Sequence, residues 1–170
     1  MIRKLLVLAG TVVTLTAATA LPAAAATPVS FTLTAGALSI SAPTAAVSLG
    51  SQVASTTSSI MSGQIGIVTV TDQRGGTTTW TASVISTAFT PTAGPADPAV
   101  NVSYGAGLIT VSPTVVATGI AASDLTGVST VVTGASTGIS SASWNPTISV
   151  TVPANFAPGV YAATITHSVA

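Results

Sequence analysis

The chain has 170 residues and very little charge: three basic side chains, three acidic ones, one histidine and no cysteine. Its length favours one domain, the lack of cysteine excludes a disulfide framework, and the scarcity of lysine and arginine excludes a basic surface for nucleic acid. Threonine, serine, alanine, valine and glycine dominate, which favours strands, because β-branched side chains pack well on a pleated sheet.

Residues 1–26 have the three parts of a secretory signal peptide. Arg3 and Lys4 supply the positive start, Leu5–Leu21 is the apolar stretch, and alanines form an A-x-A cleavage site at its end. A transmembrane anchor is the competing interpretation, but the threonines inside the apolar stretch favour cleavage. We therefore expect residues 27–170 to form one secreted domain, extracellular or associated with the cell wall, with no membrane insertion after cleavage.

Alternation of apolar and polar residues at a period of two indicates half-buried strands, and it recurs along the chain between glycines and prolines. Three prolines between Pro91 and Pro98 predict a loop there. In chain order, the pattern predicts strands at Phe31–Thr34, Leu38–Ser41, Val47–Leu49, Val100–Tyr104, Leu108–Val111, Val115–Val116, Val128–Val132 and Val160–Val169.

The central stretch, Ile65–Val84, contains two further alternating runs on either side of Asp72–Gly76. A Gly-Gly pair between two such runs is a hairpin signal, so we predict that they pair with each other and that the second continues to Phe89. Gly105–Gly107 predicts a second hairpin, and Pro153–Gly159 is the predicted turn before the last strand. Many short strands with this spacing predict an all-β fold, an antiparallel immunoglobulin-like β-sandwich.

Two motifs lie at opposite ends of this pattern. Val70–Gly75 reads Val-Thr-Asp-Gln-Arg-Gly and precedes Trp80-Thr81-Ala82, while Tyr161–Val169 closes the chain. In this order they resemble the WxL domain, a cell-wall-binding surface domain of Gram-positive bacteria, which has Val-Thr-Asp-x-Arg-Gly before Trp-x-Leu and ends in Tyr-x-x-x-Leu-Thr-Trp-x-Leu. The chain has Ala82 where the family has Leu and His167 where it has Trp. The resemblance implies non-covalent binding to peptidoglycan.

Four candidate ligand-binding residues lie in the first motif or before the last predicted turn. Asp72 and Arg74 form either a polar recognition tip or an ordinary solvated turn. Trp80 either stacks on a ligand or belongs to the core, where aromatic side chains are concentrated. Trp144, beside Pro146, is the better candidate for an exposed aromatic side chain.

Tyr161 and His167, in the closing motif, complete the candidate ligand-binding set. His167 shares a strand face with Ile165 and Val169, so a histidine at the core or the sheet edge is the alternative to a ligand contact. With no cysteine, glutamate or second histidine, we expect no metal and no cofactor. Scattered aspartates and a single histidine offer no acid–base pair, so we expect no enzymatic activity.

These observations predict a secreted, non-catalytic surface protein that binds the bacterial cell wall. Its expected partners are peptidoglycan or other surface proteins, through a sheet face rich in threonine and serine together with aromatic side chains. Two alternatives remain. One is a structural subunit whose strand edges, which lack lysine, pair between copies in a homo-oligomer; the other is a small glycan-binding module with an aromatic-lined pocket.

Overall fold

The computed structural model describes residues 25–91, 96–97 and 101–170. Nearly all of the expected signal peptide and most of the predicted loop between Pro91 and Pro98 lie outside the described residues. The chain divides into two units, Met1–Leu33 and Thr34–Ala170, and every strand of the described residues belongs to the second.

The described residues form antiparallel β-strands and no helix, which confirms the all-β prediction. No described segment is a helix long and apolar enough to cross a membrane. The strands are β1 Leu38–Ser41, β2 Ser59–Gln64, β3 Val68–Asp72, β4 Thr78–Ser86, β5 Thr90–Pro91, β6 Val102–Gly105, β7 Ile109–Val111, β8 Val115–Gly119, β9 Ser129–Ser136, β10 Ser140–Trp144, β11 Thr147–Val152, β12 Tyr161–Ala162 and β13 Ile165–Val169.

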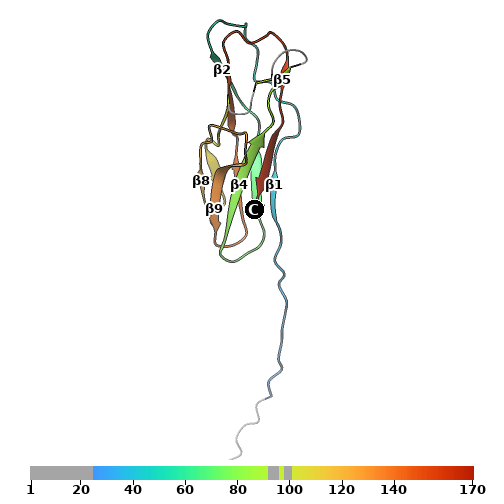
Figure 1. Ribbon diagram of the computed structural model, residues 1–170. Coiled ribbons are helices and arrows are strands. Elements are labelled where there is room, and N and C mark those ends of the chain that lie inside the picture. Colours follow the sequence, from blue (N-terminus) through green and yellow to red (C-terminus); the bar gives the residue numbers. More distant parts are fainter. Residues whose placement is uncertain (1–24, 92–95, 98–100) are drawn as a thin grey trace, which may run out of the picture. The chain divides into compact units, whose positions relative to one another are not determined.

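The strands pair into two four-stranded sheets, ordered β1-β3-β10-β7 and β13-β4-β9-β8, a three-stranded sheet β2-β11-β6 and the short pair β12-β5 (Figure 1). The three-stranded sheet continues the first four-stranded one, because β2 leads into β3, β10 into β11 and β6 into β7. The junctions contain Gly66 and Gly107, with φ of 98° and 70°, and Asn145, whose Oδ1 accepts a 3.0 Å hydrogen bond from the Gly66 amide. Glycine adopts such positive φ values without steric cost, so these residues allow the long strands to bend.

The core consists of the inward side chains of the two four-stranded sheets and of the sheet that continues the first. Burial alternates residue by residue along β3 and β4, as a period of two requires. The buried apolar residues are Val68, Val70, Trp80, Ala82, Val84, Val102, Tyr104, Ala106, Val115, Leu125, Val131, Val132, Ala142, Trp144, Ile148 and Val150.

The predicted central hairpin is wrong. β3 pairs with β1 and β10, whereas β4 pairs with β13 and β9, so the Asp72–Gly76 stretch crosses from one sheet to the other. Gly75 and Gly76 both have positive φ, as a tight connection requires, but the strands on either side do not pair. Both strands bury every second side chain, which is the pattern that strands of facing sheets also show.

The other two predicted turns also connect strands that do not pair with each other. Gly105–Gly107 is the bend between β6 and β7, which lie in different sheets, and Pro153–Gly159 is followed by β12, which pairs with β5 and not with β11. In each case the residues that permit a reversal also permit a bend or a change of sheet, because positive φ at glycine and fixed φ at proline serve all three.

Individual strand predictions had mixed outcomes. Leu38–Ser41 is β1, and Val115–Val116 begins β8, whereas Phe31–Thr34 and Val47–Leu49 are not strands. The expected closing strand is interrupted between β12 and β13, although its odd-numbered residues are half-buried and its even-numbered ones exposed, as predicted. β2 and β10 were missed, since both are rich in serine and short of large apolar residues.

Candidate functional site

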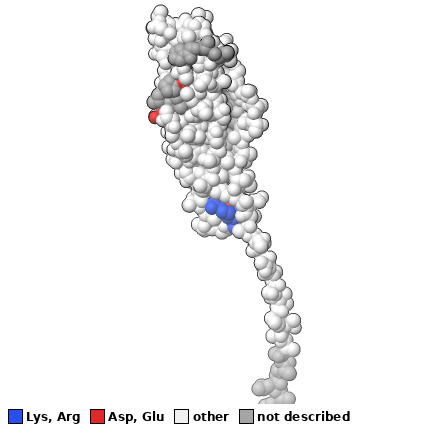
Figure 2. Space-filling view, turned by 45° about the vertical axis from the view of Figure 1, so that its right-hand side comes forward, with Lys and Arg blue, Asp and Glu red and all other residues white. Residues whose placement is uncertain are grey.

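The described surface is nearly free of charge. On the face shown in Figure 2, one blue patch lies at one end of the strand-bearing unit, and two small red areas lie farther along it. Arg74 is the only basic residue within the described ranges. Recognition of any ligand by these residues therefore depends on hydroxyl groups, backbone groups and apolar contact rather than on charge.

The two sequence motifs, far apart in the chain, lie on neighbouring strands. β4 carries Trp80-Thr81-Ala82, β13 carries His167, and their register pairs Val169 with Ala82 and His167 with Val84. Since paired residues point to the same side of a sheet, both motifs share one inward face and one outward face. Trp80 and Ala82 are buried on the inward face.

The outward face of this sheet is rich in hydroxyl groups, and we call it the hydroxyl surface, although Ile85, Val116 and Ala135 also lie on it. One row across it consists of Thr118, Thr133 and Thr81, which pair in register across β8, β9 and β4. The next positions bring Ser83 opposite Ser168 and Thr130. Aligned hydroxyls on a flat sheet can donate to and accept from the hydroxyl and amide groups of a polysaccharide.

A shallow groove of about 400 Å³ runs over this hydroxyl surface. It is lined by Thr79, Trp80, Thr81, Val116, Thr118, Thr133, Gly134 and Ala135. The groove therefore lies on the strand that carries the first motif.

Trp80 belongs to the core, as one of its two interpretations predicted: it is 3% exposed. It pairs in register with Gly134, and a Cβ at Gly134 would overlap the Trp80 indole ring. Glycine at this position therefore makes room for the ring.

Asp72 and Arg74 form a clip between the two sheets. The Asp72 carboxylate is fully buried and accepts hydrogen bonds from Arg74 Nε and Nη2, each at 2.9 Å, and from the Thr78 hydroxyl at 2.7 Å. Arg74 Nη2 also donates to the carbonyl of Thr79 at 2.8 Å. Asp72 ends β3, and Thr78 and Thr79 begin β4, so the clip joins the two sheets at this end.

The Arg74 hydrogen bonds hold the pKa of the Asp72 carboxyl well below its usual range, against the opposing effect of burial. The same pair raises the pKa of Arg74. Asp72 is thus occupied within the protein, and one third of the Arg74 side chain is exposed to solvent.

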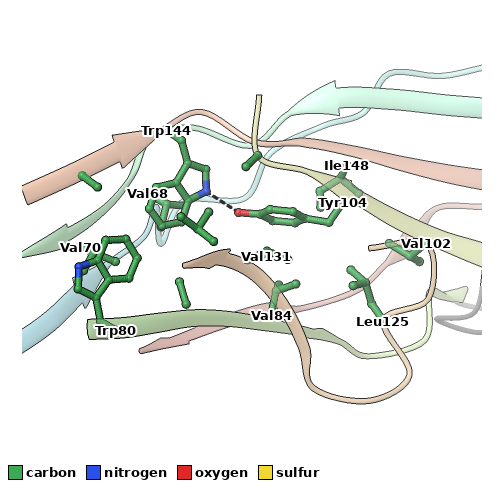
Figure 3. Close-up of a cluster of buried hydrophobic side chains, with 14 of the residues drawn as sticks. Val68, Val70, Trp80, Val84, Val102, Tyr104, Leu125, Val131, Trp144 and Ile148 are labelled. Atoms are coloured by element: carbon green, nitrogen blue, oxygen red, sulfur yellow. Dashed lines mark hydrogen bonds between the residues drawn. The ribbon is translucent and has the colours of Figure 1, made fainter. Parts of the chain in front are cut away.

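Trp144 is buried, so the interpretation as an exposed aromatic residue is wrong: the side chain is 2% exposed. Its indole Nε1–H donates a 2.8 Å hydrogen bond to the hydroxyl of Tyr104, as Figure 3 shows. Pro146, which suggested an exposed position, begins the continuation into β11, and this continuation keeps Trp144 on the inward face.

His167 continues this buried chain of hydrogen bonds. Its Nε2 lies 3.2 Å from the Tyr104 hydroxyl, and the two rings meet edge to face at 5.7 Å. Trp144 already donates to that oxygen, which still has a lone pair and its own proton, so the imidazole tautomer decides whether Tyr104 donates to His167 Nε2 or accepts from it. Nδ1 is buried and has no hydrogen-bond partner among the described residues.

Burial shifts the pKa values of Tyr104 and His167 in the directions that favour their neutral forms. It raises the pKa of Tyr104 to about 12, partly offset by the hydrogen bond from Trp144, and it lowers the pKa of His167 below 6.5. Neutral forms of both side chains therefore dominate at physiological pH. Trp144, Tyr104 and His167 form a chain of uncharged polar groups packed against one another.

Tyr161 lines a cavity of about 640 Å³ at the end of the unit where β5 pairs with β12. Its ring lies 5.1 Å from that of Phe156, and its hydroxyl donates to the carbonyl of Ala157 at 2.8 Å. Phe89 and the buried Asp97 also line the cavity, together with residues from the 46–59 segment and β11.

Comparison with protein-family models, curated proteins and solved structures finds no match. Any functional inference for this chain therefore rests on the geometry alone. It offers two features: the hydroxyl surface over the motif strands and the largely apolar cavity around Tyr161.

The six candidate residues do not converge on one site. Trp80 and Trp144 lie in the core, Asp72 and Arg74 at one end, Tyr161 at the cavity and His167 against Tyr104. In the described ranges, no three His, Cys, Asp or Glu side chains gather into a group that could hold a metal ion. The sequence interpretation missed Tyr104 and Asp97; neither lies in a motif, and only the fold shows that they are buried.

Proposed function

We propose that this protein is a secreted, non-catalytic cell-surface protein that binds the bacterial cell wall non-covalently. The ligand is peptidoglycan, and the contact surface is the hydroxyl face of the β13-β4-β9-β8 sheet. The protein performs no chemistry: Asp72 is occupied by Arg74, and His167 is packed against Tyr104. The fold that presents this face is proposed to be an immunoglobulin-like sandwich formed by the two bent sheets.

The observation that carries the proposal is the adjacency of the two motif strands. β4 and β13 lie side by side, and most of their outward residues bear a hydroxyl group: Thr79, Thr81, Ser83, Thr166 and Ser168, with Ile85 as the apolar exception. A polymer with many hydroxyl and amide groups finds a matching set of donors and acceptors on such a face, without any requirement for charge.

The departures from the WxL pattern are compatible with this surface. Ala82 is fully buried and His167 packs against Tyr104, so both substitutions change the core rather than the outward face. The resemblance in the motifs therefore bears on how the sheet is held together, and the ligand contacts are assigned to the threonines and serines between the motif positions.

The test is co-sedimentation of the purified secreted protein with purified Gram-positive sacculi. We expect the wild type to pellet with the sacculi and the Thr81→Val/Thr133→Val variant to lose most of that retention. Valine keeps the strand propensity and the approximate size but removes the hydroxyl groups. Retention of this variant at the wild-type level would contradict the assignment of the face.

The matched control is Thr69→Val/Thr71→Val on β3. These threonines occupy the corresponding outward positions of the other four-stranded sheet and pair with Ser143 and Ser141. Their loss should leave wall retention unchanged. If it abolishes retention instead, the wall is bound by the other face, and if the wild type stays in the supernatant, wall binding itself is wrong.

A further inference from the structure

The segment just before β1 alternates in sequence as a strand does, but it forms no strand in the structure. Val29, Phe31 and Leu33 alternate with Ser30 and Thr32, and yet the three apolar side chains are 91%, 90% and 89% exposed. A run of alternating large apolar side chains normally has one face buried. Exposed apolar side chains grouped in this way indicate a binding surface rather than an ordinary solvated segment.

The described residues also contain a largely apolar cavity without an occupant of its own. The 640 Å³ cavity around Tyr161 is lined by Met61, Phe89 and Phe156, and Val160 at its rim is 79% exposed. Its size lies within the range of pockets that enclose a ligand or a few side chains. No basic side chain lines it, so an uncharged apolar strand fits it better than an anionic ligand does.

The covalent chain limits how far the segment can reach from Gly36, and this reach is shorter than the way to the cavity along the strands of the same copy. The segment joins the sheets at the clip, where the amide of Gly36 donates to the carbonyl of Gln73 at 2.9 Å. From Gly36, five residues back to Phe31 span at most about 18 Å. β4 begins beside the clip and runs roughly 26 Å before it ends, and Phe89, farther along, lines the cavity.

We propose that residues 29–33 of one copy insert into the Tyr161 cavity of a second copy. Phe31 is the central anchor, flanked by Val29 and Leu33, in the manner of a strand donated between subunits. Because the donor segment and the acceptor cavity are different surfaces, the contact is heterologous, and repetition of it joins copies head to tail. Linear assemblies follow, independently of binding to the wall.

The charge of the chain suits this assembly. The donor segment and the rim residues Val47 and Val160 carry no charge, so no repulsion opposes the contact and salt should affect it little. The segment also follows shortly after the expected cleavage point at residue 26, and secretion would therefore leave the donor strand near a free end.

The test uses two variants of the secreted protein, each defective in one half of the contact. Phe31→Ser removes the donor anchor, and Val160→Asp places a charge at the cavity rim; both positions are exposed, so folding should persist, as circular dichroism would verify. In analytical ultracentrifugation, the wild type should form a concentration-dependent series of oligomers. Each variant alone should lose every species larger than a monomer.

A mixture of the two variants distinguishes head-to-tail assembly from other kinds of association. The Phe31→Ser copy keeps its cavity and the Val160→Asp copy keeps its strand, so the mixture should form a one-to-one dimer and nothing larger. Leu108→Ser is the control, since Leu108 is 87% exposed but lines neither feature, and it should assemble as the wild type does.

A second measurement uses the absence of cysteine from the chain. Phe31→Cys in one copy and Ala54→Cys in another, at the cavity lining, should form a disulfide-linked dimer under oxidation, whereas Leu108→Cys with Ala54→Cys should not. A wild type that stays monomeric at every concentration would overturn the proposal. So would oligomers that survive Phe31→Ser, since these would show pairing through sheet edges.

Discussion

Among single residues, His167 carries the clearest consequence for solution behaviour. It is the only histidine, it packs against Tyr104, and burial lowers its pKa below the ordinary value of 6.5. The unfolded chain therefore binds a proton more readily than the folded protein does. The free energy of unfolding should be at its full value above pH 6.5 and should fall as the pH decreases below it.

Protonation of His167 also disturbs the hydrogen-bond chain. In the imidazolium both ring nitrogens are donors: Nε2 would donate to the Tyr104 hydroxyl, whereas the buried Nδ1–H would have no acceptor among the described residues. We expect urea midpoints of the wild type to fall between pH 6.5 and pH 5, and those of His167→Phe to stay level over that range. An equal fall in both proteins would place the titrating group elsewhere.

The two tryptophans show what could be predicted at single positions. Trp80 follows a clean alternation through Ala82 and Val84, and its burial was among the interpretations that the sequence supports. Trp144 precedes Pro146, and the sequence alone does not distinguish a proline at a chain reversal from one at a bend. Its inward position depends on the pairing of β10 with β3 and β7, which are distant in sequence.

At the scale of the strands, alternation predicts faces but not partners. β1 and β4 have the expected inward residues, because a period of two is a local property. All three predicted reversals were nevertheless assigned to the wrong geometry, since β3 and β4, or β6 and β7, bury side chains just as the two arms of a hairpin would. The choice among hairpin, bend and sheet crossing depends on contacts between distant segments.

The pairing of β4 with β9 yields a test of core packing. Gly134 lies beneath the Trp80 indole, so Gly134→Ala should lower the free energy of unfolding by about 1–3 kcal/mol, through overpacking of a close-packed site. Urea denaturation would measure this change. Gly105→Ala in β6 is the control, because a Cβ there meets no atom within 4 Å and should change stability little.

A Gly134→Ala protein as stable as the wild type would show that the indole moves aside without cost. The packing of Trp80 against Gly134 would then contribute little to the stability of the sheet. Loss of wall retention without loss of stability, by contrast, would show that Gly134 matters through the groove that it lines rather than through packing against Trp80.

For the whole molecule, the two ends of the strand-bearing unit are built differently. At one end, the Asp72–Arg74 clip links β3 to β4 through side chains; at the other, β5 and β12 form a short ladder beside the cavity. The candidate surfaces follow from this arrangement, which no local pattern predicts. The hydroxyl face requires β4 and β13 to be neighbours, and the cavity requires the 46–59 segment to meet residues 156–161.

The clip predicts how the molecule responds to acid. The folded-state pKa of Asp72 lies below its ordinary value of 3.8, because Arg74 and Thr78 donate hydrogen bonds to the carboxylate. The stability that Asp72 contributes is therefore present above pH 3.8 and is lost as the pH falls below that value. Wild-type urea midpoints should drop steeply below pH 3.8. Hydrogen exchange should accelerate first at the backbone amides of residues 73–77, which connect β3 to β4.

Two variants test whether this loss of stability in acid comes from the clip. Asp72→Asn should be less stable at neutral pH, since an amide cannot accept both Arg74 hydrogen bonds, but it should lose the steep acid step. Asp124→Asn is the matched control: that carboxyl is exposed and its pKa is also lowered, by hydrogen bonds from Thr126, yet it joins no sheets. Its variant should keep the acid step. If Asp72→Asn keeps the step and Asp124→Asn loses it, the sheets are not held together by the clip.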